Sequence, residues 1–172
     1  MRKQKGFSLI ELLIVVAIIL IIAAIAIPNL LRARIAANES SAVQSIRTVN
    51  TAQVTYQSTY PTVGYATGMT NLGPQSSTGC TTPTSATACL VDWVVAQATA
   101  AGSAKSGYWF TSTAFNSGGL NNAYTIGGAP AVLSQTGVRG FCSNEDGVIR
   151  YTASTAAPVT TTAACAAYTS LQ

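Results

Sequence analysis

An apolar run near the start of the chain limits what this protein can be. Residues 7 to 27, FSLIELLIVVAIILIIAAIAI, contain only two polar side chains, Ser8 and Glu11. As an α-helix the run would be roughly 31 Å long, close to the hydrocarbon thickness of a lipid bilayer. Its length and composition predict a segment that crosses a membrane.

Glu11 is the exception within this run. An ionised carboxylate in the centre of a bilayer costs several kcal/mol unless a cation pairs with it. A secretory signal peptide, with the AIA at residues 24–26 as its cleavage site, would explain the small residues, but its apolar core usually has only ~7 to 15 residues. A simple membrane anchor would explain the length and would leave Glu11 unpaired.

Charged residues are scarce and unevenly distributed. Only 8% of the 172 residues are charged and 48% are hydrophobic, which is unlike a typical cytosolic enzyme. Arg2, Lys3 and Lys5 contribute three of the nine Lys and Arg residues, and without them six cations face five acids. The basic excess therefore belongs to a short leader, and we expect no specific nucleic-acid surface.

Helical periodicity continues beyond the apolar run. Pro28 removes one helical hydrogen bond, so we predict a kink there. We expect one long helix from Phe7 to about Ser58, and its second half should pack one stripe onto the rest of the chain. Apolar residues recur in this half at intervals of three, four and seven, and they are Ile35, Ala42, Ile46, Val49, Tyr56 and Tyr60.

The remaining residues predict a small α+β domain. Residues 90–102 indicate a short helix closed by Gly102, with Leu90, Val94 and Ala98 on one face. NEDG at residues 144–147 fits a hairpin turn. We expect a small antiparallel sheet that covers the apolar stripe, while the tail after Thr152 shows no clear period. The predicted strands are four runs rich in β-branched and aromatic residues, at 107–115, 123–132, 137–142 and 147–152.

Four cysteines follow the apolar run, in a chain that has no histidine. Two disulfides in an oxidising compartment are therefore favoured over a zinc site. Three pairings are possible, and the spacing favours Cys80 with Cys89 and Cys142 with Cys165. These bonds would close loops of about 10 and 24 residues, each stabilising by roughly 2.5 to 3.5 kcal/mol in the chain-entropy model.

The sequence indicates no catalytic, cofactor or metal site. It contains no phosphate-binding loop, nucleophile–base pair or cluster of metal ligands, and the acids after the apolar run are Glu39, Asp92, Glu145 and Asp146. The tryptophans and tyrosines are expected in the core and in strand pairing. We therefore expect a protein that is no enzyme and that needs no cofactor.

The stretch KGFSLIELLIVVAII resembles the leader and the start of the mature chain in type IV pilins and the related pseudopilins of type II secretion. In that family a prepilin peptidase cuts after a glycine, and the new N-terminal residue is usually N-methylated. The resemblance implies a cut between Gly6 and Phe7, with methylation of Phe7. Glu11 matches the glutamate near the start of the mature chain, and Pro28 matches the helix-breaking proline.

The resemblance implies the pilin fold, a long N-terminal helix packed on a small antiparallel sheet. Residues 1–6 would be a cleaved leader, residues 7–28 the membrane-spanning and filament-core half of the helix, and residues 29–172 a periplasmic or extracellular globular domain. The implied partners are other copies of the chain in a helical filament, the prepilin peptidase and N-methyltransferase, and an inner-membrane assembly platform. The subunit would first be single-pass in the inner membrane and later lie in a surface pilus or a periplasmic pseudopilus.

The resemblance leaves three functions open: a subunit of a type IV pilus for adhesion, motility or DNA uptake, a pseudopilin of type II secretion, and a minor ligand-binding pilin. Four cysteines and few acids favour a pilus, because major pseudopilins commonly use calcium instead. Residues 143–164, beside the last disulfide, are a candidate contact surface. Glu11 would pair with the Phe7 amine of a neighbouring subunit, and because an unpaired buried charge costs about 3 to 5 kcal/mol, misaligned neighbours would be rejected.

Overall fold

The computed structural model describes residues 7 to 171. The expected leader, residues 1–6 with Gly6, lies outside the described residues, so the cleavage site stays a prediction. The chain divides into two compact units between Arg34 and Ile35.

Helix α1, Leu9–Thr59, continues through Pro28 and contributes to both units. Its end lies one residue beyond the predicted end at Ser58. In the first unit its apolar side chains are exposed, and this part of the helix is long and apolar enough to cross a membrane. The continuous helix confirms the predicted long element, and the kink at Pro28 remains a prediction.

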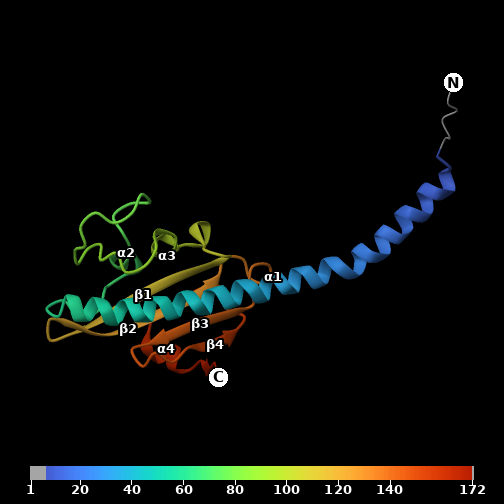
Figure 1. Cartoon of the computed structure of the whole chain (residues 1–172). Helices are drawn as coiled ribbons and strands as arrows, with labels where there is room; N and C mark the ends of the chain where they lie inside the picture. Colours follow the sequence, from blue (N-terminus) through green and yellow to red (C-terminus); the bar gives the residue numbers. More distant parts are fainter. Residues whose placement is uncertain (1–6, 172) are drawn as a thin grey trace. The chain divides into compact units, whose positions relative to one another are not determined.

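In the second unit, α1 buries the stripe that the sequence predicts. Ala42, Ile46, Val49 and Tyr56 are buried, and Tyr60 lies at the border of the core. Their spacing of three, four and seven places them on one face of a helix with 3.6 residues per turn. This face lies against the sheet, as Figure 1 shows for the second half of α1. Ile35, the first residue of the predicted stripe, is half-buried and lies outside the core.

The sheet is antiparallel and has five strands in the order β1-β2-β3-β4-β5, so each strand pairs with the one that follows it in the chain. Four runs in the sequence predict the first four strands. The fifth comes from the tail, where no strand was expected, because two residues are too short to show a period. The strands are β1, Tyr108–Ser117; β2, Leu120–Pro130; β3, Arg139–Asn144; β4, Arg150–Ala153; and β5, Thr169–Ser170.

A glycine in the central part of the sheet makes room for α1. Gly128 of β2 pairs with Phe110 of β1 on one side and with Phe141 of β3 on the other. A Cβ atom built at Gly128 would lie 3.0 Å from the Phe110 ring and 3.4 Å from the Ile46 Cδ1 atom. The missing side chain lets Ile46 reach the sheet beside two aromatic rings.

The turn between β3 and β4 forms at the predicted residues. The Gly147 N–H donates to the Asn144 carbonyl at 3.0 Å. Gly147 has a φ of 69°, in the left-handed region that glycine adopts at little cost. The NEDG prediction is confirmed.

The short helices surround the sheet, and one of them differs from the prediction. Helix α3 is shorter than expected, because it starts after Asp92, whose side chain accepts from the Val95 N–H at 3.0 Å. The helix ends at Gln97 and not at Gly102, and Leu90 lies before its start. Ala98 is buried while Val94 is 52% exposed, so the predicted common face of Leu90, Val94 and Ala98 was wrong. The remaining short elements are α2, Met69–Leu72; α3, Trp93–Gln97; the 3-10 turn η1, Ala101–Ser103; and α4, Thr162–Ala166.

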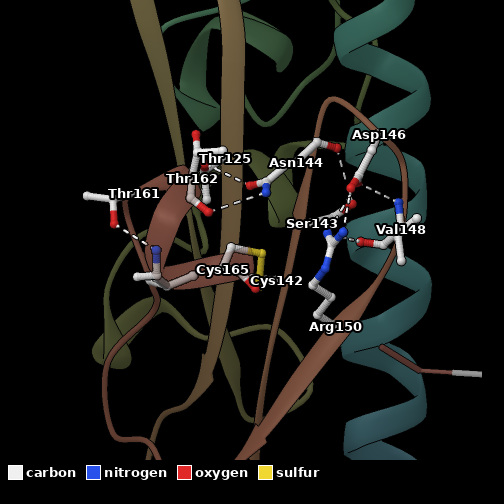
Figure 2. The surroundings of a disulfide bond; sticks show 12 residues. Thr125, Cys142, Ser143, Asn144, Asp146, Val148, Arg150, Thr161, Thr162 and Cys165 are labelled. Atoms are coloured by element: carbon white, nitrogen blue, oxygen red, sulfur yellow. Dashed lines mark hydrogen bonds and ion pairs between the residues drawn. A yellow bond between two sulfur atoms is a disulfide. The ribbon is translucent and has the colours of Figure 1, made fainter. Parts of the chain in front are cut away.

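The structure contains the two disulfides that the spacing favours. Cys80–Cys89 closes an exposed loop that is rich in Ser and Thr. Cys142–Cys165 joins β3 to α4, and both of its cysteines are fully buried (Figure 2). The second bond therefore holds the C-terminal tail on the sheet.

The tail also packs on β2. A Cβ atom at Gly127 would collide with the backbone of Val159. The Thr111 hydroxyl donates to the Val159 carbonyl at 3.3 Å. Glycine at position 127 thus permits the close approach of tail and sheet.

Candidate functional site

Glu11 lies at the start of α1 and caps it. Its Oε2 atom accepts a hydrogen bond from the Ser8 N–H at 2.9 Å, while the Ser8 carbonyl accepts the first helical bond from the Leu12 N–H at 3.3 Å. Ser8 is therefore the N-cap residue, and Glu11 occupies the third helical position. This is one half of a capping box, the reciprocal motif written S-x-x-E.

The capping contact gives the carboxylate in the apolar run a favourable environment at the start of its own helix. The N-terminus of a helix carries a partial positive charge and unpaired N–H groups, which stabilise an anion. Glu11 thus has a partner within its own chain. SLIE at residues 8–11 carries the capping-box pattern, a local signal for this contact that the predictions from the sequence did not include.

Phe7 lies next to this cap, and its side chain is 79% exposed. A cut between Gly6 and Phe7 would create an amine on Phe7. This amine would lie one residue before Ser8, whose N–H donates to the Glu11 carboxylate. The new cation and the carboxylate would then be at the same end of the helix. The two predicted site residues are thus brought together, and the pairing with a neighbouring copy stays a prediction.

The apolar side chains of the first unit form a continuous exposed surface. One hollow of this surface is lined only by apolar residues, Leu9, Leu12, Leu13, Val16, Ala17 and Leu20. Folded proteins rarely leave contiguous apolar patches of this kind in water. This surface therefore requires lipid or other protein around it.

Glu39 is a buried acid in the second unit, where its carboxylate connects α1 to β3. The Oε1 atom accepts from the backbone N–H groups of Val138 at 3.0 Å and Arg139 at 3.1 Å. The Oε2 atom accepts from the Arg139 Nε–H at 2.8 Å and forms an ion pair with the Nη2 atom of the same guanidinium at 2.7 Å. All of these donors come from Arg139, the first residue of β3, and from Val138, the residue before it.

The surroundings of Glu39 keep it ionised. Burial raises the pKa of this carboxyl, but the N–H groups of Val138 and Arg139 and the guanidinium outweigh burial, so that the pKa is lowered. The Arg139 guanidinium also lies 5.6 Å from the ring centroids of Phe141 and Tyr151. No local sequence pattern indicates this role of Glu39, because its partners are 99 and 100 positions away.

A second polar group, Gln53, is fully buried on α1. Its Nε2 atom donates to the Ala66 carbonyl at 3.1 Å and to the Ser112 hydroxyl at 2.9 Å. Its Oε1 atom accepts from the Ala66 N–H at 2.8 Å. The Gln53 side-chain amide thus bonds both the N–H and the carbonyl of Ala66, as a neighbouring strand would, and holds the loop after α1 against the helix.

The candidate contact surface at residues 143–164 begins with the last two residues of β3, Ser143 and Asn144, which are buried. Residues 145–148 are exposed, whereas Ile149 and Pro158 are buried. The Asp146 carboxylate and the Arg150 guanidinium form an ion pair across the turn between β3 and β4. Most of this segment is accessible, and its role in contacts stays a prediction.

Comparison with known proteins identifies the N-terminal segment. Residues 1–27 match the family model of the prokaryotic N-terminal methylation motif. The chain is 68% identical over 40 residues to the type IV wide pilus major component PilA4 of Thermus thermophilus, a match that covers 23% of this chain and 30% of that protein. The N-terminus is therefore of the prepilin type.

Two further relatives resemble longer parts of the chain. The type IV major pilin protein PilA of Myxococcus xanthus is 46% identical over 54 residues, 31% of this chain and 24% of that protein. The type II secretion system core protein G of Vibrio cholerae is 42% identical over 65 residues, 36% of this chain and 44% of that protein. Each match spans less than half of the relative, and no solved structure matches the chain.

Proposed function

We propose that the chain, with its prepilin-type N-terminus, is a structural subunit of a type IV pilus. The observation that carries this proposal is the 68% identity over 40 residues with a major component of a type IV pilus. The exposed apolar surface of the first unit supports it, because a filament core would cover these side chains after they leave the membrane. Such a subunit is acted on by processing enzymes and performs no catalysis itself.

The proposed route begins with the whole precursor in the inner membrane. Prepilin peptidase removes residues 1–6, and the amine of Phe7 is methylated. The assembly platform then moves the subunit into the base of a helical filament of identical copies. Glu11, which caps its own helix, pairs in the filament with the Phe7 amine of a neighbour.

A pseudopilus of type II secretion is the second candidate. It is supported by the 42% identity over 65 residues with the core protein G of Vibrio cholerae. Both functions use the same processing and the same filament core. They differ in whether the fibre extends from the cell surface or stays in the periplasm and moves secreted proteins.

Deletion of the gene in its own bacterium distinguishes the two. For a pilus subunit, electron microscopy should show surface fibres on wild-type cells and none on the deletion strain, while the set of secreted proteins stays the same. Re-expression of the full chain should restore the fibres. Loss of secreted proteins with unchanged surface fibres would contradict the pilus proposal and favour the pseudopilus.

A further inference from the structure

The charges of the globular unit are almost completely paired. The described part of this unit, residues 35–171, has four basic and four acidic side chains. Three ion pairs use six of them: Glu39 with Arg139 at 2.7 Å, Asp92 with Lys105 at 3.9 Å, and Asp146 with Arg150 at 2.5 Å. Arg47 and Glu145, which have opposite charges, form no ion pair within this part of the chain.

Arg47 lies on the exposed side of α1, between two hollows. One hollow, of about 300 Å³, extends along the helix from Gln44 to Thr55 and reaches Leu90. The other, of about 220 Å³, is bordered by Val43, Phe141 and Leu171, together with the Glu39–Arg139 pair. Among the residues that line the two hollows, Arg47 is the only charged side chain without an ion-pair partner.

The other polar side chains in the first hollow include three threonines, and another protein could cover these at little cost. The hydroxyls of Thr48, Thr51 and Thr55 donate to the carbonyls four residues earlier, at 3.0, 3.1 and 2.9 Å. Hydroxyls that are already bonded lose little when water is removed from them. A partner that covers this face therefore needs one negative charge, placed opposite Arg47.

Glu145 is exposed at the turn between β3 and β4, and the residues on both sides of it are held in place (Figure 2). The Asn144 side chain accepts from the Thr125 hydroxyl at 2.9 Å. The Asp146 carboxylate accepts from the Val148 N–H at 2.9 Å and pairs with Arg150. The turn thus presents one free carboxylate on a rigid support.

We propose that Glu145 of one copy pairs with Arg47 of the next copy in the filament. The inference rests on the proposed function, because it needs assembly of identical chains. The two surfaces differ, so the contact is head-to-tail, and such a contact repeats into an open filament when its rotation does not close a ring. Since the other described charges of the globular unit have ion-pair partners, a shifted contact between two globular units would leave Arg47 and Glu145 without one. Arg32 and Arg34 of the first unit also form no ion pair among the described residues, and the crosslinking test distinguishes a contact of Glu145 with Arg47 from one with these cations.

Cysteine crosslinking tests the proximity directly. The full-length chain would carry Arg47→Cys and Glu145→Cys together, and the filaments would be treated with a short thiol-reactive crosslinker. A ladder of covalent oligomers is expected on non-reducing gels, because each copy is linked to the next. Either cysteine alone should give no ladder, and Arg47→Cys with Asn122→Cys, an exposed residue outside the turn, is the matched control.

Charge reversal tests the interaction. Arg47→Glu and Glu145→Arg should each lower the amount of sheared filaments by about tenfold, with the membrane level of the subunit unchanged. The double variant, which exchanges the charges, should recover to within about threefold of wild type. The matched control is Lys105→Ala, which removes a cation whose partner lies within the same copy and leaves the Asp92 cap of α3 in place, and it should assemble as wild type.

The inference would be overturned if wild-type filaments form, while the two reversed variants assemble normally and the two cysteines give no ladder. Failure of the double variant to recover would also overturn it. Absence of filaments from wild-type cells would count against the proposed function instead. In that case a ladder from the membrane fraction would still support the contact between copies.

Discussion

Glu39 on α1 and Arg139 at the start of β3 are 100 positions apart in the chain, and their ion pair joins the helix to the sheet. The carboxylate receives two backbone N–H groups as well as the guanidinium. Its side chain is only 7% exposed, whereas that of Arg139 is 42% exposed. The pair is therefore a buried anion held by a partly exposed cation.

Substitution of Glu39 should destabilise the globular unit. Glu39→Ala leaves the N–H groups of Val138 and Arg139 without an acceptor, and we expect a loss of about 2 to 4 kcal/mol in the free energy of unfolding. Denaturation of the purified full-length chain in detergent, followed by circular dichroism, measures this. Arg47→Ala, which breaks no described ion pair, should stay within about 0.5 kcal/mol of wild type, and an equal effect of both would contradict this account.

The same carboxylate should make stability depend on pH in the acidic range. The pKa of Glu39 is lowered in the folded protein, so this stabilisation is fully present above the unfolded pKa of about 4.3. It is lost as the pH falls from there through the lower folded pKa. Unfolding of wild type and Glu39→Gln at a series of pH values checks this.

The Glu39→Gln variant should lose less stability than wild type below about pH 4.3, because it has no carboxyl to protonate at this position. Asp146, whose pKa is lowered by the hydrogen bond from Arg150, adds a loss in the same range and is present in both proteins. Parallel curves for the two proteins would show that Glu39 contributes nothing to the acid sensitivity.

Gln53 should be important for the loop that follows α1. Gln53→Leu keeps a similar volume and removes the partners of the Ala66 N–H and carbonyl, so we expect a loss of about 2 to 4 kcal/mol in unfolding free energy. Amide hydrogen exchange at Ala66 should become faster as well. Gln44→Leu, on the exposed side of the same helix, is the control and should leave the exchange at Ala66 unchanged.

The cap at Glu11 gives a test that separates its two possible roles. Glu11→Gln retains an acceptor for the Ser8 N–H and removes the charge, whereas Glu11→Ala removes both. If pairing with a neighbouring amine is required, both variants should be cleaved and inserted in the membrane, and both should form few filaments. Counts of sheared filaments and the membrane level of the cleaved subunit measure this.

Normal filament numbers for Glu11→Gln, with few for Glu11→Ala, would instead assign to Glu11 the capping of its own helix. Normal numbers for both would show that assembly depends on neither role. Each comparison uses strains without a wild-type copy of the gene.

Processing of the precursor should be visible in the mass of the intact chain. The membrane or filament form should begin at Phe7 and carry one added methyl group, since residues 1–27 match the N-terminal methylation motif. Gly6→Val should accumulate as uncut precursor, because a side chain there should obstruct the peptidase. A mature chain that begins at Ile27 would instead establish an ordinary secretory signal peptide.

The features that the sequence determined by itself are those with a local cause. The stripe of Ala42, Ile46 and Val49 follows from the 3.6-residue period, and the turn at Asn144–Gly147 follows from the preference of glycine for positive φ. The apolar run requires only its length and composition to predict a membrane span. The hydrogen bond by which the Glu11 carboxylate caps the Ser8 N–H is equally local and could have been predicted from the S-x-x-E pattern.

The tertiary structure alone decided which polar groups become partners across long distances in the chain. Glu39 meets Arg139, and Gln53 meets Ser112, because α1 packs on the sheet in one register that no short pattern encodes. The strand Thr169–Ser170 exists because the tail returns to β4, with Cys165 tied to β3, although its two residues have no strand period of their own. Burial then makes each polar contact obligatory, since a buried donor or charge without a partner would cost more than the fold could tolerate.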